Sequence, residues 1–291
     1  MGGRASIAGA GTTDIKKLAI VGFAVAALAD SVSHALVHGI GYILAYITAR
    51  GLLPASMVAS GVVGLLSDLV ELYFVALITP YAIKGSVPQP SEALRDWRAG
   101  RLVHCLAILM ILRGISLAIW PNTGAGVLEV ISAVVLALAF SMWCSRSDYR
   151  PTFLLGSVLL TIAGFAGAPP LINVHLGLFG IALLIPAVAA LFYSTSASRS
   201  RGLSGGAPDA LRSLANTVSA IIASTALIAG GAQTITEFVS ELRVLGWVCA
   251  GGVIGIIGGV IALLVGIVAL IASLTRLHPH ASPPSQGGQY G

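Results

Sequence analysis

The chain has 291 residues, of which 56% are hydrophobic and only 9% charged, with a formal net charge of +5. A soluble domain carries about 25% charged residues, so this composition excludes a soluble globular protein and makes lipid the solvent for much of the surface. The basic residues are scattered over several connectors instead of forming one stripe, so we predict the lipid bilayer as a partner and no nucleic acid.

Basic clusters alternate with apolar stretches and so predict a membrane topology. Thirteen of the sixteen basic residues fall on every second connector or at the ends of the chain. Lys and Arg near a span resist translocation, which retains them on the cytoplasmic side. We therefore predict an all-α, polytopic integral membrane protein of the cell membrane, with about eight transmembrane helices in four hairpins and both termini cytoplasmic. The clusters are Arg4, Lys16 and Lys17; Lys84, Arg95, Arg98 and Arg101; Arg146 and Arg150; Arg199, Arg201 and Arg212; and Arg276.

The first hairpin follows a cytoplasmic N-terminal segment, residues 1–16, and comprises spans 17–50 and 53–83. A straight helix over the first of these spans would be about 51 Å long, against a hydrocarbon core of ~30 Å. This span must therefore tilt, protrude or break, and Gly39 and Gly41 are its weak point.

Three further hairpins complete the predicted architecture. The first six spans form a membrane region over 17–193, and a Ser-, Gly- and Arg-rich stretch over 194–210 is predicted to be a flexible cytoplasmic linker. A two-helix, glycine-rich membrane hairpin follows over 211–276, and the polar tail 277–291 is predicted to be disordered. The six later spans are 101–120, 123–145, 151–168, 171–193, 211–236 and 244–275.

Small residues form a stripe along the last span at alternating intervals of three and four. They are Gly252, Gly255, Gly259, Ala262, Gly266 and Ala269. Such a stripe lets another backbone approach closely, which is how helices associate in lipid. The preceding span offers a partner face, Ser219, Ala223, Ala226 and Gly230. We expect tight packing within the protein, with a dimer seam or a sliding surface as the alternative.

Ionisable residues inside the spans each need a partner or a function, because charge in hydrocarbon costs at least ~2.5 kcal/mol. Arg113 and Glu129 lie at matching depth on two spans joined by a tight turn. We predict that they form a structural ion pair.

A second set of ionisable residues is predicted to converge near the middle of the membrane. Asp30, His34 and His38 are spaced four apart and share one helix face, and Asp68 and Glu71 share a face of the next span. Counting residues from the outer ends of these two spans places the acids and His34 at nearly equal depth.

This second set could bind a divalent metal ion such as zinc or manganese, because imidazole and carboxylate groups are ligands for both. It could equally pass a proton. In the structural alternative, the acids are protonated or pair with the histidines and bind no ligand. A haem would need histidines on two facing helices, and His175 is the outer partner available to His38.

The sequence favours membrane transport, by a cation- or proton-coupled carrier or a channel whose polar site lies between the first two spans. No nucleotide-binding loop, GxSxG or HExxH motif occurs, so we assign no catalytic residue, and a membrane-embedded enzyme is a minor alternative. The main alternative is a non-catalytic membrane subunit or scaffold of a respiratory, secretion or DNA-transfer complex. A homo-oligomer or other membrane subunits would then be its partners.

Overall fold

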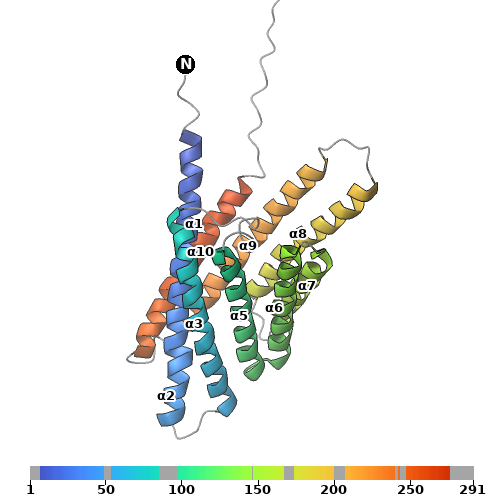
Figure 1. The fold of residues 1–291 in the computed structure, drawn as a ribbon. Coiled ribbons are helices and arrows are strands. Elements are labelled where there is room, and N and C mark those ends of the chain that lie inside the picture. Colours follow the sequence, from blue (N-terminus) through green and yellow to red (C-terminus); the bar gives the residue numbers. More distant parts are fainter. Residues whose placement is uncertain are drawn as a thin grey trace, which may run out of the picture.

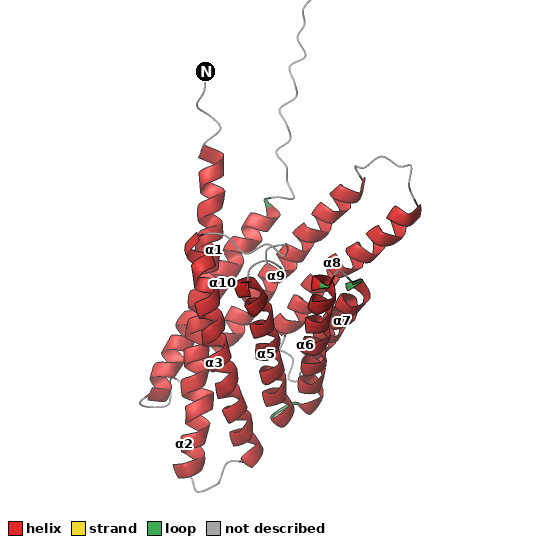
Figure 2. Ribbon diagram, in the orientation of Figure 1, coloured by secondary structure: helices red, strands yellow, loops and turns green. Residues whose placement is uncertain are grey.

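The computed structural model describes residues 7–48, 54–84, 97–145, 147–166, 174–199, 207–239, 242 and 247–275. Nearly all of these residues are helical, which confirms the predicted all-α class (Figure 2). In chain order the elements are α1 (Ile7–His34), the π-helix η1 (Ala35–Ile40), α2 (Gly41–Thr48), α3 (Ala55–Lys84), α5 (Trp97–Ile119), α6 (Thr123–Cys144), α7 (Arg150–Ala166), α8 (Val174–Arg199), α9 (Ala207–Val239) and α10 (Trp247–Leu274).

Seven helices in the described residues are long and apolar enough to cross a membrane. The first of them runs through α1, η1 and α2, over Lys17–Thr48. The fifth predicted span, 151–168, corresponds to α7, which is apolar but has only 17 residues. At about 25 Å it is shorter than the ~30 Å hydrocarbon core. The architecture is therefore that of a multi-pass membrane protein with one short helix.

The helices follow one another around a closed ring. Each packs against its neighbours in the order α1, α3, α5, α6, α7, α8, α9, α10, and α10 returns to pack against α1. The seam between the first and last helices includes a hydrogen bond from Ser33 Oγ to the carbonyl oxygen of Gly251, 2.7 Å long. The first turns of α1 and the last turns of α10 lie at the same end of the bundle (Figure 1). We call this arrangement the helix ring.

The long first span does not end at its glycines; it passes through a π-helical segment. A π-helix is a wide helical turn that often marks functional sites, and here it carries His38 and Gly39. Gly39 is buried against α3, where an added Cβ would lie 3.1 Å from Leu65 Cδ1. The weak point predicted at Gly39 is therefore a change of helix type. The helix also begins at Ile7, well before the predicted start of the span.

The predicted linker and the spans around it differ from the structure in their bounds. Helix α8 continues to Arg199 and α9 begins at Ala207, so both ends of the 194–210 stretch are helical. Residues 200–206 and the predicted tail 277–291 lie outside the described residues. Helix α9 also continues to Val239, three positions beyond the predicted end of its span.

The glycines of α10 pack within the protein, against α9 and α1. A Cβ added at Gly259 would lie 2.8 Å from the carbonyl oxygen of Gly231 in α9, and one at Gly266 would lie 3.0 Å from that of Ser224. Gly255 contacts both Phe238 of α9 and Ser33 of α1, and Gly252 is buried. Close internal packing is therefore what the structure shows for this stripe.

The partner face on α9 is not the one predicted. Ser219 donates a hydrogen bond to the carbonyl oxygen of Ala182, and Gly230 lies against His175, so both residues face α8. Gly231 and Ser224 face α10 in their place. The prediction missed this because α9 packs against two helices, and small residues occur on both of its contact faces.

We expect Gly259→Leu to lower the free energy of unfolding by about 1–3 kcal/mol, because the added side chain would displace the α9 backbone. Thermal denaturation in detergent measures the effect. Val260→Leu is the matched control, since Val260 is 42% exposed on the same helix. Equal melting temperatures for the two variants would contradict the packing described here.

Candidate metal centre

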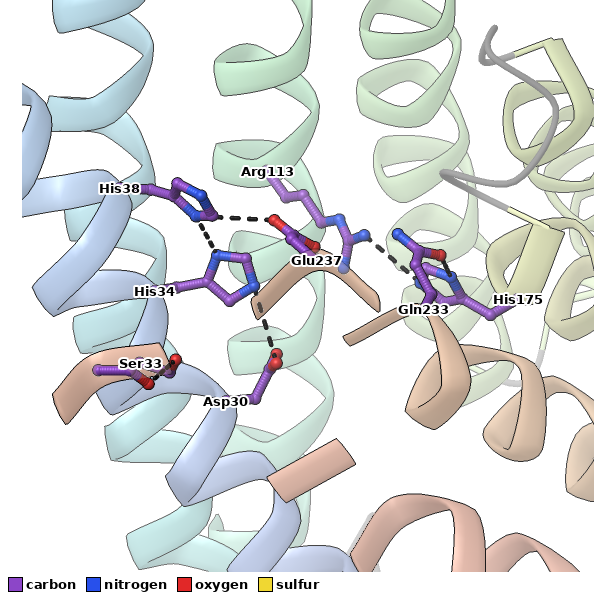
Figure 3. A network of polar contacts seen from close by, with 9 residues as sticks. Asp30, Ser33, His34, His38, Arg113, His175, Gln233 and Glu237 are labelled. Atoms are coloured by element: carbon purple, nitrogen blue, oxygen red, sulfur yellow. Dashed lines mark hydrogen bonds and ion pairs between the residues drawn. The ribbon is translucent and has the colours of Figure 1, made fainter. Parts of the chain in front are cut away.

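Two histidines and one glutamate bring their ligand atoms together between η1 and α9 (Figure 3). The Nδ1 atoms of His34 and His38 lie 2.9 Å apart, and His38 Nδ1 lies 3.7 Å from Glu237 Oε1. One ligand atom from each residue lies within 4.8 Å of the other two. His34 ends α1 and His38 lies in the π-helical segment, so the change of helix type occurs at the site itself.

Asp30 and Phe238 hold the two imidazole rings from outside this group. His34 Nε2 lies 3.7 Å from Asp30 Oδ1, one helical turn earlier. A carboxylate at the second nitrogen of a ligating histidine fixes which nitrogen carries the proton and how the ring is turned. Phe238 is fully buried, and its ring centroid lies 5.1 Å from that of His34 and 5.8 Å from that of His38.

Among the described residues, these three side chains are of the types that a divalent metal ion binds. Zinc binds imidazole nitrogen and carboxylate oxygen at about 2.0–2.2 Å, and catalytic zinc sites commonly use three protein ligands and one exchangeable ligand. The side chains of His34, His38 and Glu237 are between 22% and 36% exposed. The rest of the protein therefore covers these side chains only in part.

Asp68 and Glu71 lie on α3, and the third member of the closest ligand group comes from α9 instead. Asp68 is buried, and its backbone carbonyl accepts a hydrogen bond from Ser31 Oγ at 2.8 Å. Asp68 and Glu71 are therefore not members of this ligand group, whose residues belong to α1, η1 and α9.

A second polar network joins α6, α5, α8 and α9. Arg113 Nε lies 3.8 Å from Glu129 Oε1, so the two residues expected to pair are close together. The same guanidinium donates through its second terminal nitrogen to His175 Nε2 at 3.4 Å, and His175 Nδ1 lies 2.9 Å from Gln233 Oε1. Helices α5 and α6 can approach this closely because a Cβ at Gly114 would lie only 2.9 Å from the carbonyl oxygen of Gly126.

The two polar networks meet on one face of α9 and cross the interior of the helix ring. Gln233 and Glu237 are four positions apart, and residues at this spacing share a helix face. The contacts of His38 with Glu237 and of Arg113 with His175 join helices that are not neighbours in the ring. Figure 3 shows these side chains pointing toward one another from both sides.

Sequence reasoning missed Glu237, Phe238 and Gln233. Glu237 was overlooked because the predicted span ended at residue 236, which left this glutamate in a connector, whereas α9 reaches Val239. Helical spacing from Gln233 to Glu237 was the available signal. His175, considered as an outer partner for His38, instead contacts Arg113 and Gln233.

No known protein family, curated protein or solved structure matches the chain.

Proposed function

We propose that this protein carries a divalent transition-metal ion of the zinc or manganese class across a membrane. His34, His38 and Glu237 would bind the ion, and Asp30 would orient His34. The observation that carries this proposal is the meeting of three ligand atoms within 4.8 Å between helices of a multi-pass membrane protein.

The balance of charge along the polar networks supports a cation as the ligand. Five carboxyl groups contribute to these networks and their surroundings, and among the described residues Arg113 contributes a permanent positive charge, next to Glu129. Ionisable groups inside membranes are expensive and mark ion pathways. A bound divalent cation would offset the excess of acids. The five are Asp30, Asp68, Glu71, Glu129 and Glu237.

The coordination number supports transport over a purely structural role for the metal. Structural zinc sites are usually closed by four protein ligands, whereas sites that exchange a ligand keep one position open. Over the part of the chain that the structure describes, the ligand group has three members, and all of them are partly exposed. Such a site can take up and release an ion without first breaking apart.

Proton passage is the second candidate, and one feature of the geometry favours it. Asp30, His34, His38 and Glu237 form an unbroken series of contacts in which His34 uses both ring nitrogens. Imidazole groups can accept a proton on one nitrogen and release it from the other.

A third proposal retains the scaffold alternative, in which these contacts only hold helices together within a larger membrane complex.

Uptake into proteoliposomes containing a metal-sensitive dye separates the three proposals. Saturable uptake of zinc or manganese by the wild type, with none by the double variant His34→Ala/His38→Ala, is the expected result. Dissipation of a pH gradient without metal uptake would favour proton passage. If the folded wild type supports neither, the transport proposal fails and the scaffold proposal gains weight.

A further inference from the structure

Glu129 is a buried carboxyl group with unusually few partners. Its side chain is 1% exposed, and neither carboxylate oxygen has a hydrogen-bond donor among the described residues. Its charged neighbour on α5 is Arg113, at 3.8 Å. On the other side α7 begins with Arg150 and has no further ionisable residue. The ion pair with Arg113 is therefore the interaction that offsets the free-energy cost of burying an ionised Glu129.

A path of direct contacts leads from Glu129 to the helix that supplies Glu237. Arg113 contacts Glu129 on one side and His175 on the other, and His175 contacts Gln233 on α9. The side chain of Arg113 is 47% exposed, so it is held less tightly than the acid that it faces.

We propose that Glu129 is the proton-binding site coupled to the metal centre, with Arg113 as the positioning residue between them. This inference rests on the proposed metal site. When Glu129 is ionised, its charge offsets that of Arg113. When Glu129 takes a proton from solvent, the charge of Arg113 is no longer balanced and opposes a cation among the interior acids. Proton and metal binding therefore exclude each other, which is the requirement for exchanging one for the other.

Linkage makes this coupling reciprocal: if a proton on Glu129 weakens metal binding, metal binding must release that proton. Histidine ligands also release protons when they bind a metal. The number of protons that Glu129 releases is therefore the difference in proton release between the wild type and a variant without this carboxyl group. Glu129→Gln removes the ionisable group and keeps the size of the side chain. Asp148→Asn is the matched control, because Asp148 is an exposed carboxyl in the connector between α6 and α7.

The test is calorimetric titration of the detergent-purified full chain with zinc in two buffers of different ionisation enthalpy. Wild type and Asp148→Asn should release equal numbers of protons, and Glu129→Gln about one proton fewer per zinc while still binding zinc. Equal proton release by all three proteins would overturn the proposal. A wild type that binds neither zinc nor manganese would instead overturn the proposed function.

Infrared difference spectroscopy of the wild type gives a second readout, which is needed if Glu129→Gln fails to fold. Removal of zinc near neutral pH should produce a carbonyl band of a protonated carboxylic acid, and Glu129→Asp should shift that band. An absent or unshifted band would overturn the assignment to Glu129. If the Arg113–Glu129 pair is purely structural, removal of zinc should not produce this band. Glu129→Gln should then release as many protons per zinc as the wild type.

Discussion

Replacing His38 with alanine is expected to weaken zinc binding more than about a hundredfold. His38 Nδ1 lies between His34 Nδ1 at 2.9 Å and Glu237 Oε1 at 3.7 Å, so its loss leaves two ligands that no longer share a centre. Even residues that only support a ligand contribute about 10–100-fold to metal affinity. Titration of the purified protein with zinc against a competing chelator measures the effect.

His104→Ala is the matched control for this experiment. His104 lies on α5, where its Nδ1 bonds the carbonyl oxygen of Gly100 and its ring contacts Phe140. Its removal should leave zinc affinity unchanged. Asp30→Asn should have an intermediate effect of about 10–100-fold, because it leaves all three ligands but loosens the ring of His34. If His38→Ala and His104→Ala bind zinc equally well, the site has been placed wrongly.

With saturating zinc, which keeps Glu129 ionised, Arg113→Gln is expected to lower the free energy of unfolding by about 3 kcal/mol. Removing one member of a buried ion pair leaves the other charge uncompensated, at a cost of about 3–5 kcal/mol. The lower end applies because Arg113 is half exposed although Glu129 is fully buried. Unfolding in mixed micelles of increasing denaturing detergent measures the change.

The double variant Arg113→Gln/Glu129→Gln provides the control for this second prediction. It removes the buried acid together with its partner, so much of the lost stability should return. Arg101→Gln, at an exposed arginine of the same helix that contacts the Tyr73 hydroxyl, should have little effect. A double variant no more stable than Arg113→Gln alone would show that Glu129 does not account for the cost.

The class of the protein could be predicted from the sequence because membrane solvation acts on every residue of a span. The proximity of Arg113 and Glu129 could be predicted as well, since a tight turn between adjacent helices fixes both their depth and their neighbours. The contact between η1 and α9 could not be predicted from the sequence. Counting residues along a span gives the depth of Asp68 or Glu71, but not the direction in which each side chain points around the helix.

The third ligand shows how a small error in a helix boundary can hide a site. Glu237 lay one position beyond the predicted span, and the helix continues because Glu237 and Phe238 pack against η1 and α10. That packing depends on closure of the helix ring between α1 and α10. Closure is a long-range property, so no local pattern of apolar residues encodes it.

Closure of the helix ring also has a consequence for biosynthesis. His38 leaves the ribosome about 200 residues before Glu237, which corresponds to roughly 10–40 s of synthesis at ordinary rates of about 5–20 residues per second. Throughout this interval the first span must remain in the bilayer with Asp30, His34 and His38 and without their partner from α9. The polar face of the newly made first span therefore requires temporary protection, from the insertion machinery or from α3, until the last hairpin arrives.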